Sequence, residues 1–181
     1  MIKKKVNIRE LCQISIFTAI IVICAQVSIP MPYGVPMTLQ TFAIPLAGVV
    51  LGKKNGTIAT LIYILLGASG VPVFAGFTSG MGIIFSMTGG FIISFPFMAW
   101  SAGVGAAREN NLILIMWLLA GTTINSLCGM LIYSLVTSNS LTASFGYVVT
   151  PFIPAALVKI VLVIAVGKSL RQALKKSGVL L

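Results

Sequence analysis

The sequence contains no histidine and only two acidic residues, Glu10 and Glu109, among 181 residues. Enzymes that move protons or bind catalytic metals rely on histidine and on paired carboxylates, and neither arrangement is present. A proton relay through a membrane needs the same residue types. The sequence therefore predicts neither an enzyme nor a metal-binding protein, and we expect no cofactor.

Cysteine is also scarce. Cys12, Cys24 and Cys128 are odd in number and lie far apart in apolar segments, a pattern that fits neither a disulfide framework nor a metal site. The sequence has no phosphate-binding loop of the form Gly-x-x-x-x-Gly-Lys-Ser/Thr either. The protein is therefore not expected to hydrolyse ATP itself.

Charged residues make up 8% of the chain and hydrophobic residues 58%. A soluble domain carries about 25% charged residues, so these proportions predict an integral membrane protein with a single domain over residues 1–181. The net charge is +10, but the basic residues flank apolar runs and do not form a basic face with interleaved aromatic residues. Nucleic acid is therefore not an expected partner.

The apolar runs predict an all-α bundle of six transmembrane helices with ordered loops on the outer side, since a bilayer core about 30 Å thick takes about 20 apolar residues. The expected helices lie near residues 11–29, 39–51, 56–66, 82–105, 112–135 and 152–167. The second and third are short, so each is expected to tilt or to continue into an ordered loop.

The basic residues support this count because nearly all of them fall on one side of such a bundle. They are Lys3, Lys4, Lys5, Arg9, Lys53, Lys54, Arg108, Lys168, Arg171, Lys175 and Lys176, whereas the loops on the other side, at 30–38, 68–81 and 136–151, carry none. The positive-inside rule then places both termini in the cytoplasm of a multi-pass plasma-membrane protein.

Lys159 is the exception, because it lies inside the apolar run 152–166 with no acidic residue nearby. A charge at this depth is costly and usually meets a partner, a water-filled cavity or a ligand. At 1.5 Å per residue, Lys159 lies about 10 Å below the outer end of its helix, and its side chain leans outward. We expect a ligand contact; the alternatives are snorkelling to the outer headgroups or a carbonyl partner.

The outer loops are uncharged but rich in proline and glycine. Prolines stiffen residues 30–36, which suits a lid, and Gln40 follows, where its amide offers a donor and an acceptor to a ligand or to the loop itself. Glycines in 67–80 permit close approach of backbone to a ligand, with a tight turn as the alternative. Further candidate ligand contacts are Tyr33, Phe74, Thr78, Ser79, Thr88 and Gly89; the aromatic rings have helix packing or the membrane interface as alternatives.

Several segments in these regions resemble one known family. They are Pro36-Met37-Thr38-Leu39-Gln40-Thr41-Phe42, Leu46-Ala47-Gly48 with Leu51-Gly52, Gly70-Val71-Pro72-Val73-Phe74, Thr88-Gly89-Gly90-Phe91, and Pro151-Phe152-Ile153-Pro154 with Lys159. Together they are similar to the BioY family, the biotin-binding S components of energy-coupling factor (ECF) transporters. The resemblance implies a substrate-capture subunit that binds biotin in an outward-facing cavity and works with a transmembrane coupling subunit and cytoplasmic ATPases.

One position departs from the family pattern. In the family this segment resembles Pro-Phe-x-Pro-Gly-Asp-x-x-Lys, whose Asp and Lys contact the ureido end of biotin; here Lys159 matches and Ala156 replaces the Asp. Loss of one charge-assisted hydrogen bond would weaken binding by about one to two decades. An S component for another vitamin or heterocycle is therefore an alternative; a structural membrane subunit or a small facilitator fits less well.

Small residues four positions apart let helices approach closely. The resemblance implies that Ser15 and Ala19 dock the coupling subunit, where the family has alanine at both positions; internal packing is the alternative. Gly121, Asn125 and Gly129 have the same spacing. We expect them to pack inside the bundle, with an interhelical hydrogen bond from Asn125.

Overall fold

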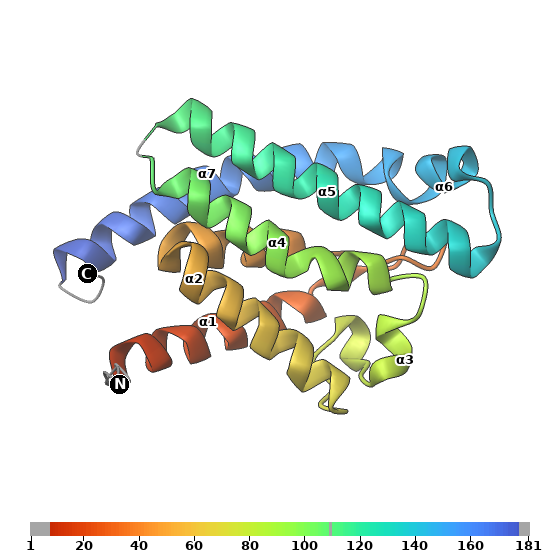
Figure 1. The fold of residues 1–181 in the computed structure, drawn as a ribbon, viewed down its shortest axis with the longest axis horizontal. Coiled ribbons are helices and arrows are strands. Elements are labelled where there is room, and N and C mark those ends of the chain that lie inside the picture. The colour runs from red at the N-terminus through yellow and green to blue at the C-terminus, as the bar shows by residue number, and fades with distance from the viewer. Residues whose placement is uncertain (1–7, 109, 178–181) are drawn as a thin grey trace, which may run out of the picture.

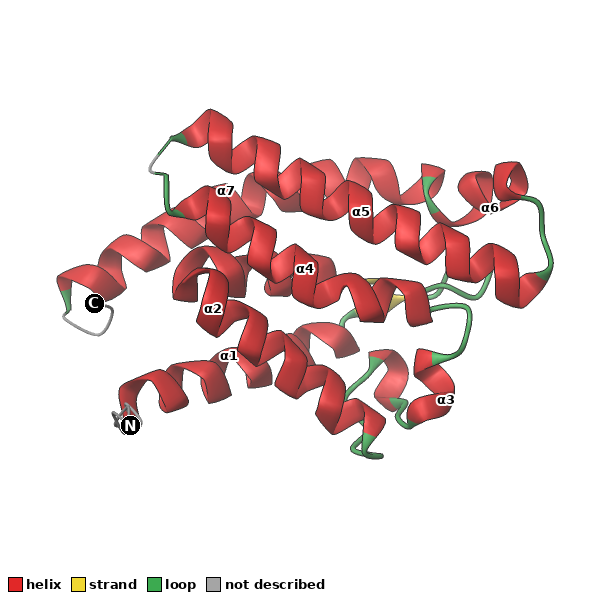
Figure 2. Ribbon diagram, in the orientation of Figure 1, coloured by secondary structure: helices red, strands yellow, loops and turns green. Residues whose placement is uncertain are grey.

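The computed structural model describes residues 8–108 and 110–177. Its long helices lie side by side in one bundle (Figure 1). Only two very short strands depart from an all-α architecture in the described part of the chain (Figure 2). The long helices are α1 (Ile8–Gln26), α2 (Gln40–Ala68), α4 (Gly89–Ala106), α5 (Asn111–Thr137) and α7 (Ile153–Lys176). The short elements are β1 (Ser28–Ile29), β2 (Met37–Thr38), η1 (Ala75–Phe77), α3 (Met81–Ile84), α6 (Leu141–Val148) and η2 (Thr150–Phe152).

The helix α2 consists of two arms joined at a sharp turn. Gly52 has φ 80° and ψ 169°, a region that is essentially limited to glycine. A straight helix would separate Gln40 from Tyr63 by about 35 Å, yet Gln40 Nε2 donates a hydrogen bond to Tyr63 OH. A Cβ added to Gly56 would lie 2.7 Å from Gly48 Cα. The arms 40–51 and 53–68 therefore pack as an antiparallel pair, in the stretches where the sequence predicts two short helices.

Five stretches of the described chain are long and apolar enough to span a membrane, namely 8–26, 40–68, 89–106, 111–137 and 141–174. This makes the protein a multi-pass membrane protein. The folded-back α2 counts as one stretch here, and α6 and α7 are joined into another.

Several predicted helix boundaries are wrong. The first helix ends at Gln26 because the following residues pair as β1 with β2. The helix expected over 82–105 is interrupted, since α3 ends at Ile84 and α4 begins at Gly89. The last helix continues well past residue 167, and the loop expected over 136–151 contains α6. These errors arise because an apolar run does not show where the backbone turns, and a polar helix can extend beyond the bilayer.

The arms of α2 form the centre of the bundle and pack against α1, α4 and α7, while α4 packs against α5. Small residues allow these contacts to be close. At Gly48 a Cβ would overlap the backbone of Ala99, and at Gly103 it would overlap the backbone of Lys53. The same packing holds the turn at Gly52 against the end of α4.

The two ends of the bundle differ in charge. The start of α1, the turn of α2, the α4–α5 connection and the end of α7 lie at one end, while α3 and α6 lie at the other (Figure 1). At the first end, Arg171 Nη1 donates to Ala106 O at 2.6 Å and Lys168 Nζ donates to Asn111 Oδ1. Lys3, Lys4 and Lys5 lie outside the described residues. Among the described residues, the basic segments that were predicted to share one side of the membrane therefore lie at the same end of the bundle.

Candidate ligand-binding site

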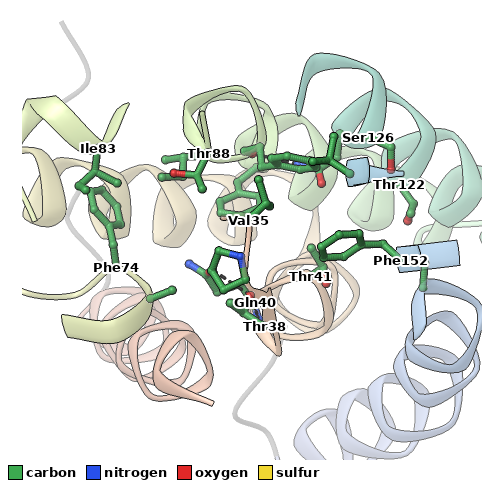
Figure 3. A pocket seen from close by; sticks show the side chains of 18 of the residues that line it. Val35, Thr38, Gln40, Thr41, Phe74, Ile83, Thr88, Thr122, Ser126 and Phe152 are labelled. Carbon is green, nitrogen blue, oxygen red and sulfur yellow. Dashed lines mark hydrogen bonds between the residues drawn. The ribbon is translucent and has the colours of Figure 1, made fainter. Parts of the chain in front are cut away.

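A cavity of about 290 Å³ lies at the end of the bundle that carries α3 and α6, between α2, α4, α5 and α7 (Figure 3). Its size is near the lower limit of small-molecule sites, and such sites typically combine apolar walls with a few polar groups. The apolar lining includes Val35, Phe74, Ile83, Phe91, Ile92, Phe95, Val148 and Phe152. The polar lining consists of Thr38, Gln40, Thr41, Thr78, Thr88, Thr122, Asn125, Ser126 and Lys159. The cavity therefore suits a small, partly polar organic ligand.

The first segment over the cavity is the hairpin that connects β1 to β2. Its ends are fixed by antiparallel pairing of Ser28 with Thr38. Val35 is buried and packs with Val148 of α6, while the Tyr33 ring stacks on Tyr147 with ring centroids 4.0 Å apart. These contacts attach the proline-rich segment to α6 and give it the position of a lid.

The second segment, residues 69–80, is held by Gln26 at the end of α1. Gln26 Nε2 donates to Val73 O at 3.2 Å and to Phe74 O at 3.1 Å, and its Oε1 accepts from Phe77 N at 2.9 Å. The buried Phe74 ring then packs edge-on against Tyr63 and lines the cavity. Gln26 was not among the residues predicted from the sequence, although a polar amide at the end of an apolar helix was a visible signal.

Lys159 extends from α7 into the cavity and is 9% exposed. Its Nζ donates to Thr38 O at 2.6 Å and to Thr41 Oγ1 at 2.8 Å. The carbonyl partner, one of the alternatives drawn from the sequence, is therefore present, and the low exposure of Lys159 does not fit snorkelling to the surface. Because an ammonium has three N–H donors, these two contacts leave one for a ligand.

Thr38 connects Lys159 to Gln40. Thr38 Oγ1 donates to Gln40 Oε1 at 2.9 Å, and Gln40 Nε2 donates to Tyr63 OH. Gln40 is buried but lines the cavity. The loop-stabilising role considered for Gln40 is therefore present, and the second N–H of its amide remains for a ligand.

The other candidate contacts divide into two groups. Phe74, Thr78 and Thr88 line the cavity, whereas Tyr33, Ser79 and Gly89 are not among its lining residues. Tyr33 is 46% exposed beside Tyr147. Gly89 begins α4, where a Cβ would overlap the carbonyl of Ile84. Glycine at this position therefore allows the α3–α4 turn and does not bring Gly89 to the cavity.

A polar face of α5, which was not predicted from the sequence, also lines the cavity. Thr122, Asn125 and Ser126 have the spacing of one helix face. The interhelical hydrogen bond expected of Asn125 is confirmed, since its Nδ2 donates to Phe91 O at 2.9 Å and to Ser94 Oγ at 2.8 Å. The spacing alone could have shown that the two hydroxyl groups share this face.

Ser15 and Ala19 lie outside the site. Both are exposed on α1, whereas Ile14, Phe17 and Ile21 of the same helix are buried. The pair therefore faces away from the helix bundle in the described structure, and the alternative of internal packing does not apply there.

The bundle and its cavity define a multi-pass membrane protein with a candidate small-molecule site. A model of the BioY family matches residues 1–176. The chain is 37% identical to the biotin transporter BioY of Thermotoga maritima over 91% of this chain and 96% of that protein. It is 44% identical to the probable biotin transporter BioY of Pyrococcus horikoshii over 61% of this chain and 68% of that protein.

The crystal structure of an S-component for biotin from an ECF-type ABC transporter matches the fold with a TM-score of 0.85, at 25% identity over 95% of each chain. The chain belongs to the BioY family, and the resemblance drawn from its sequence motifs is confirmed.

Proposed function

We propose that this protein is the biotin-capturing S subunit of an ECF transporter, and hence a transporter subunit and not an enzyme. Its family and the names of its relatives support this function. The observation that carries the proposal is the placement of Lys159, which presents a buried ammonium to a small and largely apolar cavity. Such a site matches a ligand with one compact polar end and an apolar body.

Biotin has these features, with a ureido ring, a thiophane ring and an aliphatic chain that ends in a carboxylate. In the proposed complex, Lys159 donates its remaining N–H to the ureido carbonyl or to the carboxylate. The aromatic rings of Phe74, Phe91 and Phe152 cover the apolar part of the ligand, and Gln40 supplies a further N–H. The lid over residues 30–36 separates the bound ligand from the outside.

For the topology, we propose six crossings, made by α1, both arms of α2, α4, α5 and α7. At 1.5 Å per residue the arms of α2 are about 18 and 24 Å long, less than a bilayer core of about 30 Å. Their connection to buried, ordered loops supports full crossings. The basic end then faces the cytoplasm and the cavity faces the outside of the plasma membrane.

Transport needs a source of energy, which we assign to separate ATPases and a transmembrane coupling subunit. The exposed pair of Ser15 and Ala19 is the proposed docking position on α1. Small residues at this spacing allow a partner helix to approach closely.

Binding of radiolabelled biotin to purified protein in nanodiscs tests the proposal. Wild type should bind saturably, and Lys159→Ala should weaken binding about 10- to 100-fold, the value of one charge-assisted hydrogen bond. Lys54→Ala is the control, because this lysine is exposed at the opposite end of the bundle. Absence of biotin binding by folded wild-type protein would contradict the proposal.

A second candidate is an S subunit for another vitamin or heterocycle, favoured by Ala156, which lines the cavity with a methyl group. Ala156→Asp would place a carboxylate one helical turn from Lys159. If biotin is the ligand, its affinity should hold or rise in this variant. A fall would favour a cavity shaped for a different molecule.

A further inference from the structure

We infer that Asn125 is a ligand-binding residue whose Oδ1 accepts a hydrogen bond from an N–H group of the ligand. The inference rests on the proposed function, because it assigns a further contact to the same ligand. It gives α5 a part in recognition, beside Lys159 of α7.

The orientation of the Asn125 amide is fixed by α4. The two helices approach closely here, since a Cβ on Gly90 would overlap the carbonyl of Cys128 and a Cβ on Gly129 would overlap the Phe91 ring. Asn125 is 3% exposed, and its Nδ2 uses both protons, on Phe91 O and Ser94 Oγ. A carbonyl can only accept, so the amide end that faces α4 is the nitrogen.

The oxygen of the same amide is left without a donor. No described residue donates a hydrogen bond to Asn125 Oδ1. In the described chain, Ser144 Oγ is the single side-chain polar atom that is both unpartnered and fully enclosed by protein. Asn125 Oδ1 is therefore not fully enclosed. Because Asn125 lines the cavity, an oxygen that is neither bonded nor enclosed by protein faces that space. An acceptor without a hydrogen-bond partner is unfavourable in a largely apolar cavity, and a ligand N–H would supply the missing partner.

Among the described lining residues, no other side-chain amide or carboxylate oxygen is free for this role. The oxygen of the second amide, Gln40 Oε1, already accepts from Thr38 Oγ1. The described residues that line the cavity include no aspartate or glutamate. Figure 3 shows Thr122 and Ser126, the neighbours of Asn125 on α5, across the cavity from Gln40 and Thr38. A cyclic urea, with N–H and C=O groups on one small ring, can meet an acceptor from α5 and a donor from Lys159 together.

The test compares biotin with its two N-methyl ureido isomers, each of which replaces one N–H by N–CH₃. Dissociation constants are measured in nanodiscs for wild type, Asn125→Ala and Ser94→Ala. In wild type, the isomer that loses the N–H facing Asn125 should bind more weakly than the other isomer. Asn125→Ala should weaken biotin binding about 5- to 150-fold and remove the difference between the isomers.

Ser94→Ala is the matched control, because it breaks the same contact between α4 and α5 but Ser94 does not line the cavity. It should keep the preference between isomers. If Asn125 had a purely structural role, Asn125→Ala would also keep the preference between the isomers, and that result would overturn the inference. Wild-type affinity for biotin in folded Asn125→Ala would overturn it as well. If Asn125→Ala does not fold, Asn125→Ser allows the same comparison. Failure of the proposed function is a separate outcome, because wild type itself would then not bind biotin.

Discussion

Replacing Gly52 with alanine isolates the cost of folding α2 back on itself. The glycine has φ 80° and ψ 169°, and a Cβ added to it meets no heavy atom within 4 Å. Steric overlap with the rest of the protein is therefore excluded, and backbone strain remains as the cause of any loss of stability. Strain of this kind costs about 1–3 kcal/mol. Gly52→Ala should lower the free energy of unfolding by about this amount.

Unfolding in SDS mixed micelles can measure the difference through the fluorescence of Trp100 and Trp117, whose rings meet edge-on between α4 and α5. Gly82→Ala is the matched control. Its Cβ also meets nothing within 4 Å, and its φ lies outside the positive range. At this position alanine should leave the free energy of unfolding unchanged or raise it by about 0.4–1 kcal/mol. Equal unfolding curves for the two variants would refute the argument for a strained turn.

The remaining predictions concern the loops and the orientation. Gln26→Ala removes three hydrogen bonds to the segment 69–80, so amide exchange in that segment should accelerate at least about tenfold; unchanged exchange would contradict the assigned role. Breaking the stack of Tyr33 on Tyr147 with Tyr33→Ala should raise the biotin dissociation rate about 2- to 10-fold, the value of an aromatic pair; an unchanged rate would show that this stack does not hold the lid. In a background without native cysteines, Lys54→Cys should react with a membrane-impermeant maleimide only from the cytoplasm and Val71→Cys only from outside; the reverse pattern would refute the orientation.

The positions of most helices could be predicted because an apolar run is a local property of the sequence. The pair Lys53 and Lys54 separates two apolar runs, and the turn of α2 lies beside it. The α3–α4 turn has no such signal, since Phe85 and Met87 are as apolar as a helix interior. That turn depends on backbone contacts and on Ser86 Oγ, which donates to Ile83 O at 2.7 Å.

The site could be predicted only in part. A lone lysine in an apolar helix indicates a cavity or a partner, and Lys159 does line one. Its contact with Thr41 joins residues 118 positions apart in the sequence, so it depends on how α2 and α7 pack. The high glycine content of a segment did not show whether its residues contact a ligand or form a turn. Gly89, an expected ligand contact, lies at the α3–α4 turn. The nitrogen of the Asn125 amide holds α4, whereas the oxygen has no hydrogen-bond partner among the described residues and is the contact proposed for a ligand.

In the proposed function, the contacts of Lys159 would also connect ligand binding to the lid. A buried ammonium loses hydration, and hydrogen bonds to two neutral oxygens offset only part of that loss. An anionic or carbonyl oxygen of a ligand would complete the compensation, so part of the binding free energy would come from a charge that the fold alone leaves poorly solvated. One of the two oxygens, Thr38 O, belongs to β2 at the base of the lid. A ligand that draws Lys159 toward itself therefore acts directly on the strand that positions residues 30–36, and binding and lid closure are expected to be coupled through this contact.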